Sequence, residues 1–93
     1  MPSAWVSRAA PRSALLHHGL GLSLIRSGQR EAALGELTQA SRLAPDNPRY
    51  VYVQAIALDG LGRRDEARSL LRSARKRFGD NAEIAAALAA FGG

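Results

Sequence analysis

A 34-residue repeat most constrains how this chain can fold. Three residues that cap helix N-termini well recur at that spacing: Ser13, Asn47 and Asn81. Their side-chain oxygens can accept hydrogen bonds from backbone N–H groups that the first helical turn leaves unpaired. Gly28 and Gly62 are also 34 positions apart, and each stands where a helix needs a residue with left-handed backbone to end it. The sequence therefore predicts successive pairs of helices, each pair joined by a tight turn.

The helix boundaries follow from these caps and from apolar residues spaced three and four apart. Pro45 cannot continue the helix that precedes it, whereas Asn47 and Pro48 open the next one. The apolar residues are mainly Ala and Leu, which favours helix over sheet. We therefore expect helices over 14–27, 30–43, 48–61, 64–77 and 82–91.

Further residues keep the same register in both units. In the first unit they are Leu20, Gly21, Leu24, Gly28, Ala33, Leu37, Ala40 and Pro45. In the second they are Ala55, Leu58, Gly62, Ala67, Leu71 and Ala74. This pattern resembles the tetratricopeptide repeat, a helix–turn–helix unit of 34 residues. The resemblance implies an all-α, right-handed superhelix of such units, in which small residues let the two helices of a pair approach closely.

The expected organisation has four parts. A disordered leader covers 1–12, the first repeat 13–46, the second repeat 47–80, and a C-terminal capping helix, as a partial third repeat, 81–93. The leader has two Pro, two Ser and no acidic residue, which favours a frayed end or the cut end of a longer protein over a transit peptide. The last helix offers only Glu83 beside its cap as a polar side chain. It should therefore pack on something else or be followed by more chain.

The sequence offers few groups for catalysis or metal binding. It contains no Cys, and the adjacent His17 and His18 project about 100° apart on a helix, so they do not share one metal ion. We expect His17 to pack between helices and His18 to face a groove. The carboxylate pairs Glu31/Glu36 and Asp65/Glu66 are more typical of a helix surface than of acid–base chemistry. We expect no enzymatic activity, catalytic residue, metal site or cofactor.

In the family that the pattern resembles, the first helices of successive units line a concave groove that receives a peptide or a helix. The groove residues implied here are His18, Leu22, Ile25, Arg26, Arg49, Tyr52, Val53 and Ile56. Most are apolar, and Tyr52 is of the kind that anchors interfaces. The implied function is protein–protein interaction, as a scaffold or adaptor. The basic clamp with which some members bind chaperone tails is absent, because its positions hold His18, Leu22, Val53, Glu83 and Ala87.

Two alternatives remain. The helix over 64–77 carries a basic row in a chain of net charge +5, formed by Arg64, Arg68, Arg72 and Lys76. This row could bind nucleic acid or an acidic partner, although no aromatic residue interleaves with it to stack on bases. The second alternative is a homo-oligomer in which the alanine-rich last helix docks on a neighbouring copy.

The composition indicates source and compartment only weakly. Heavy use of Ala, Arg, Leu and Gly suggests a GC-rich bacterial source. No apolar run approaches the ~20 residues of a membrane span. We take the cytoplasm as the default compartment, and the periplasm stays open if the chain belongs to a larger exported protein.

Overall fold

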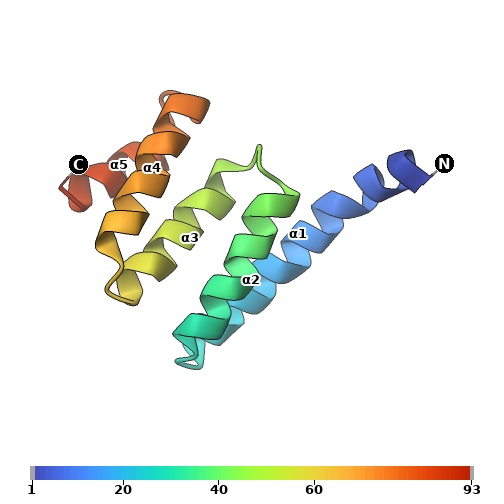
Figure 1. Cartoon of the computed structure of the whole chain (residues 1–93), viewed down its shortest axis with the longest axis horizontal. Coiled ribbons are helices and arrows are strands. Elements are labelled where there is room, and N and C mark those ends of the chain that lie inside the picture. Colours follow the sequence, from blue (N-terminus) through green and yellow to red (C-terminus); the bar gives the residue numbers. More distant parts are fainter. Residues whose placement is uncertain (1, 93) are drawn as a thin grey trace.

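The computed structural model describes the backbone of residues 2–92 and the side chains of residues 12–92. The helices are α1 (Pro2–Arg26), α2 (Arg30–Leu43), α3 (Pro48–Gly60), α4 (Arg64–Phe78) and α5 (Ala82–Ala90), and residues 2–92 contain no strand. α1 pairs with α2 and α3 with α4, and α5 packs against α4 and α3 at the end of the row (Figure 1). The prediction of an all-α stack of helix–turn–helix units is confirmed.

The turns within the two pairs have the same backbone geometry. Gly28 and Gly62 have φ angles of 81° and 79°, a conformation that costs glycine less than other residues. In both turns the residue after the glycine donates its N–H to the carbonyl five positions earlier, over 2.9 Å. These bonds satisfy carbonyls that the end of a helix leaves without partners. The predicted glycine turns are therefore confirmed.

The two asparagines cap their helices as predicted. The side chain of Asn47 accepts a hydrogen bond from the Arg49 N–H over 3.0 Å, and that of Asn81 accepts one from the Ile84 N–H over 3.1 Å. Pro48 is the first residue of α3, where its missing N–H donor is not needed. One helix therefore ends and the next begins within a few residues.

The N-terminal end differs from the prediction. α1 begins at Pro2 and continues to Arg26, so it starts earlier than the expected helix over 14–27, and Ser13 lies inside the helix instead of capping it. The segment contains several Ala residues, which have the highest helix propensity. Pro2 lies in the first turn, where proline is tolerated. Pro11 costs one backbone hydrogen bond inside the helix, and the helix nevertheless continues through it.

Small residues bring the paired helices close together. A Cβ atom built on Gly21 of α1 would lie 2.7 Å from Cγ and Cδ2 of Leu37 on α2. One repeat later, Ala55 of α3 and Ala67 of α4 have no exposed surface, and Leu71 beside them in the core is fully buried. The close approach implied for Gly21 and Ala55 is therefore present, and the main core forms where the paired helices meet.

Two glycine substitutions should change stability in opposite directions. Gly21→Ala should destabilise the protein by about 1–2 kcal/mol, because the buried Leu37 cannot yield to the new methyl group without the helices moving apart. Gly35→Ala in α2 should stabilise it by about 0.5–1 kcal/mol, since the added Cβ meets no atom within 4 Å and alanine favours helix. Urea denaturation of both variants measures the two effects. An unchanged midpoint for Gly21→Ala would contradict the packing argument.

Candidate functional site

The predicted groove residues lie on α1 and α3 and differ in exposure. Ile56 is 40% exposed, and the side chains of Arg26 and Arg49 are also exposed. Four others are half-buried: Leu22, Ile25, Tyr52 and Val53. His18 is buried. Among the predicted groove residues, Ile56 therefore provides the main exposed apolar side chain.

An apolar pocket joins two of the predicted residues. Ile25, near the end of α1, and Ile56 of α3 line a pocket of about 150 Å³, together with Arg30, Ala57 and Gly60. An apolar cavity of roughly this size can hold a group as large as benzene. The structure therefore brings Ile25 and Ile56 together where one aliphatic or aromatic side chain of a partner could enter.

Tyr52 and Val53, two of the predicted groove residues, contribute to the core. Both side chains are half-buried and pack against the main hydrophobic cluster. Truncating Tyr52 would therefore remove core contacts as well as any contact with a partner. Ile56 is the better position at which to separate binding from stability.

The adjacent histidines differ in burial, and His18 departs from the prediction. His18 is only 8% exposed, and its ring centroid lies 4.6 Å from that of Tyr50 on α3. His17 is half-exposed, and its Nδ1 lies 2.6 Å from Oε1 of Glu36 on α2. His17 therefore contacts α2 while keeping part of its surface exposed, whereas the expectation that His18 faces the groove was wrong. Ala14, one turn before His18, is fully buried, so His18 lies on the face of α1 that packs inward.

The surroundings of His18 favour its neutral form. Burial and, to a lesser extent, the positive charge of Arg49 hold the pKa of His18 below its ordinary value of 6.5. Its Nδ1 is buried and has no hydrogen-bond partner among the described residues. His18 is therefore a packing residue where α1 meets Tyr50 of α3. Within residues 12–92, no three His, Asp or Glu side chains gather as a metal site would require.

The predicted basic row on α4 divides into two parts. Nε of Arg64 donates to Oδ1 of Asp59 over 3.0 Å, and its guanidinium lies 5.4 Å from the centroid of the Phe91 ring. A terminal nitrogen of Arg68 lies 3.8 Å from Oδ1 of Asp65. Arg64 and Arg68 therefore interact with side chains of their own chain and do not form one uniform surface with Arg72 and Lys76.

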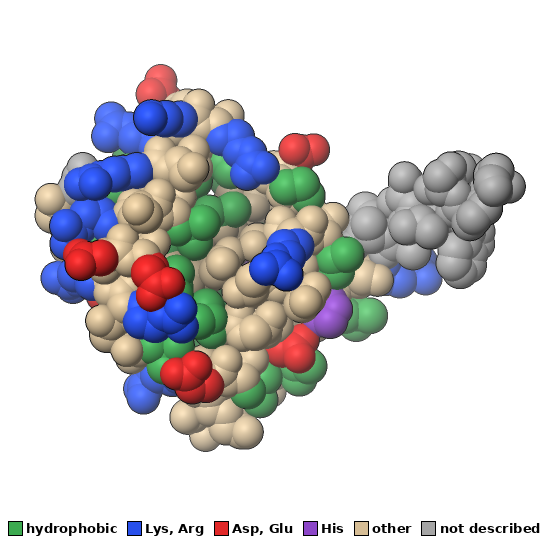
Figure 2. Space-filling view, viewed as in Figure 1, with side chains coloured by type: hydrophobic (Ala, Val, Ile, Leu, Met, Phe, Trp, Pro, Cys, Tyr) green, Lys and Arg blue, Asp and Glu red, His purple; other side chains and the backbone are tan. Residues whose placement is uncertain are grey.

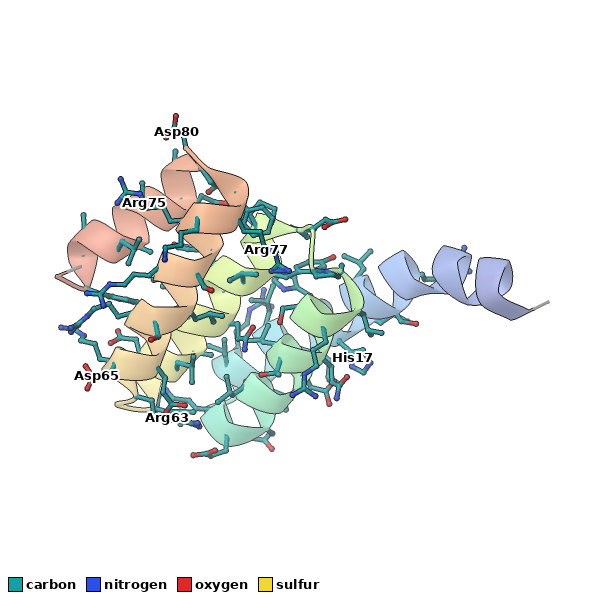
Figure 3. The ribbon with its side chains drawn as sticks, turned by 45° about the horizontal axis from the view of Figure 1, so that its top comes forward. His17, Arg63, Asp65, Arg75, Arg77 and Asp80 are labelled. Carbon is teal, nitrogen blue, oxygen red and sulfur yellow. The ribbon has the colours of Figure 1, made fainter. Side chains whose placement is uncertain are left out.

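The other part of the row lies at a cleft between α4 and α5. Arg72, Arg75 and Lys76 surround Leu88 there, in a cleft of about 410 Å³. The three basic side chains are exposed. Figure 2 shows basic side chains gathered over the α4–α5 end of the molecule, and Figure 3 shows Arg75 on the opposite side of α4 from Arg77. Arg75 was not in the predicted row, although its spacing from Arg72 and Lys76 places it on the same flank.

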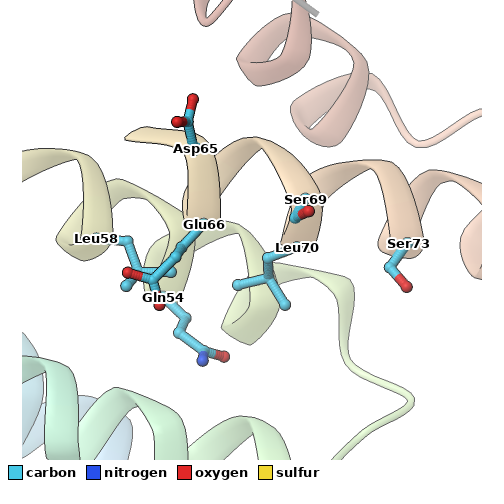
Figure 4. A pocket seen from close by; sticks show the side chains of 7 residues that line it. All are labelled: Gln54, Leu58, Asp65, Glu66, Ser69, Leu70 and Ser73. Atoms are coloured by element: carbon cyan, nitrogen blue, oxygen red, sulfur yellow. The ribbon is translucent and has the colours of Figure 1, made fainter. Parts of the chain in front are cut away.

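A third hollow, which no sequence pattern predicted, lies between α3 and α4 (Figure 4). It has a volume of about 650 Å³ and is lined by Gln54, Leu58, Asp65, Glu66, Ser69, Leu70 and Ser73. Oε1 of Gln54 accepts a hydrogen bond from the Ser41 hydroxyl over 2.6 Å, and its Nε2 donates to Thr38 Oγ1 over 3.3 Å. Gln54 therefore links α3 to α2 at the edge of this hollow.

The stacked antiparallel pairs define a helical-repeat protein. The family model described as tetratricopeptide repeat matches residues 24–91, and the chain belongs to that family, which generally mediates protein–protein interaction. No curated protein matches the chain. Within residues 2–92, no helix is both long and apolar enough to cross a membrane.

The depressed pKa of His18 predicts loss of stability in acid. Well above pH 6.5, His18 is neutral in both the folded and the unfolded state. As the pH falls through that value, the unfolded chain takes up the proton more readily than the folded chain, so the free energy of unfolding decreases. The decrease ends below the lower pKa that His18 has in the folded state. His18→Phe should remove this part of the pH dependence while keeping an aromatic ring against Tyr50.

Thermal denaturation between pH 7.5 and 5 measures the effect, and His17→Gln is the matched control. That control should keep the part of the acid destabilisation that His18 causes, because it leaves the buried ring in place. The same pH dependence in His18→Phe as in the wild type would show that His18 is not responsible.

Proposed function

We propose that this chain is a protein–protein interaction module, an adaptor or scaffold that holds an apolar peptide or helix of a partner across α1 and α3. One observation carries the proposal: the exposed Ile56 stands beside Ile25 at an apolar pocket between the two helices. An apolar side chain beside a pocket is where an anchoring residue of a bound helix gains most by leaving water. We propose no catalytic role and no cofactor.

The polar rim of this groove supports the same reading. Arg49 of α3 donates to Oε2 of Glu83 on α5 over 2.9 Å, and both side chains are exposed. An exposed pair of this kind contributes only about 0–1 kcal/mol to stability. It could therefore open to a partner at little cost, and both side chains could then contact polar groups of a bound peptide.

The groove proposal predicts a specific effect of one substitution. Peptides selected from a random display library against the wild-type chain should bind Ile56→Asp at least about tenfold more weakly, because a buried isoleucine contact is worth roughly 1.5–3 kcal/mol. Helicity should stay nearly unchanged, since Ile56 is 40% exposed. Calorimetric titration of each selected peptide gives the affinities.

Leu16→Asp is the matched control. Leu16 is an exposed leucine of α1 that does not line the pocket, so the control introduces the same charge outside the groove. It should keep the affinity of the wild type. Selected peptides that bind Ile56→Asp as tightly as wild type would place the binding surface elsewhere.

A second candidate function is self-association, and the exposed leucines of α1 favour it. Leu15, Leu16 and Leu20 are 60%, 69% and 49% exposed, which is unusual for neighbouring large apolar side chains. Sedimentation equilibrium over a hundredfold range of concentration should then show a dimer or larger species that Leu16→Asp dissociates and Ile56→Asp does not. A wild-type chain that stays monomeric over the whole range would exclude this candidate.

A further inference from the structure

α5 exposes the face that the corresponding helices of the two complete pairs bury. Gly21, Ala55 and Ala89 occupy the same position in three successive repeats. In the first repeat Gly21 packs against α2, and in the second Ala55 has no exposed surface. In the third Ala89 is exposed. Likewise Val51 is 5% exposed, whereas Ala85, 34 positions later, is exposed. In α1 and α3 this face packs against the second helix of the pair, and among the described residues no helix covers it on α5.

The cleft at Leu88 lies beside that uncovered face. Leu88 follows Gln54 by 34 positions. Gln54 accepts a hydrogen bond from Ser41 of α2 and, together with Leu70 of α4, lines the hollow between α3 and α4. Arg75 follows Ser41 by the same spacing and lines the cleft with Leu88. The repeat therefore continues on one side of Leu88. The other side is where a further helix would stand.

The flank of α4 that borders this place is basic. Arg72, Arg75 and Lys76 have no hydrogen bond or ion pair among the described side chains. By contrast, Arg64 and Arg68 of the same helix lie near carboxylates. Three neighbouring cations repel one another, and an anionic partner relieves that repulsion.

We infer that α5 and the adjoining flank of α4 bind an acidic amphipathic helix of a partner protein. The apolar side of that helix lies on Ala85 and Ala89, in the place that α4 takes on α3. Carboxylates along one edge of the bound helix reach Arg72, Arg75 and Lys76. This end face is separate from the groove proposed above, so each can fail without the other.

Two other occupants fit the end face less well. In a second copy of the chain, α2 and α4 are already packed. α1 exposes leucines, but over residues 2–26 it carries arginines and no acidic residue, so the basic flank would repel it. Nucleic acid would gain from the cations, but no aromatic side chain lines the cleft to stack on bases. The exposed Ala85 and Ala89 instead provide an apolar floor, which suits a helix.

Fluorescence anisotropy with three labelled probes tests the inference at about 50 and 150 mM salt. The first is a helical peptide of about fifteen residues with Leu and Ala on one face and Glu along one edge. The second replaces each Glu by Lys, and the third is a single-stranded DNA of similar length. The acidic peptide should bind more tightly than either of the others at both salt concentrations. No binding of the acidic peptide, or tighter binding of the DNA, would overturn the inference.

Matched variants locate the binding. The triple variant Arg72→Gln, Arg75→Gln and Lys76→Gln should bind the acidic peptide at least about tenfold more weakly. The control triple Arg12→Gln, Arg42→Gln and Arg77→Gln removes the same charge from other exposed positions and should change the affinity by no more than about twofold. Equal loss in both triples would show attraction to net charge alone and would refute the proposed surface.

Ala89→Glu tests the apolar floor without touching the arginines. Ala89 is exposed, so the helix should remain folded, and circular dichroism checks this. The acidic peptide should bind this variant at least about tenfold more weakly, because a carboxylate then stands where its apolar side should lie. Unchanged affinity would show that the peptide does not lie on α5.

Discussion

The contact between Gly21 and Leu37 shows what the rest of the structure depends on. Because Gly21 has no side chain, Leu37 can fill the space between α1 and α2 and lose all of its exposed surface. The second pair uses Ala55 and Leu71 at the same positions, and both are fully buried. Close contact between the two helices of a pair fixes how each first helix is rotated. The rotation decides which side chains point into the core and which remain exposed.

Between the pairs, polar contacts supplement the apolar core. Gln54 of α3 bonds to Thr38 and Ser41 of α2, and Arg49 of α3 bonds to Glu83 of α5. Arg49 and Glu83 are 34 residues apart, so the same position in successive repeats comes within hydrogen-bond distance. Such contacts help to fix register while contributing modestly to stability. Stacking therefore brings side chains of successive repeats close together, at equivalent positions in the case of Arg49 and Glu83 and at neighbouring ones in the case of Ile25 and Ile56.

Local signals made most of the fold predictable, whereas contacts between helices did not. Gly28 and Asn47 act through the backbone beside them, so sequence was enough to place turns and caps. The roles of His17 and His18 depend on a rotation of about 100° on one helix, and only the packing of α1 on α3 distinguishes them. The pairing of Arg64 with Asp59 across a turn likewise depends on the fold. The early start of α1 depends on a balance between the helix propensity of its alanines and the cost of Pro11, which local signals do not decide.

The last helix depends on the others more than any other element. A helix of nine residues is marginal in water by itself, so α5 is held by Ile84, Leu88 and Phe91, which it buries in the core. Ordering α5 costs backbone entropy, although only one of its faces is covered by other helices. The alanines on the other face bury no long side chain, so a second helix could approach closely there with little further loss of side-chain freedom. The same small residues that let α1 meet α2 therefore make the open face of α5 suited to receive a helix.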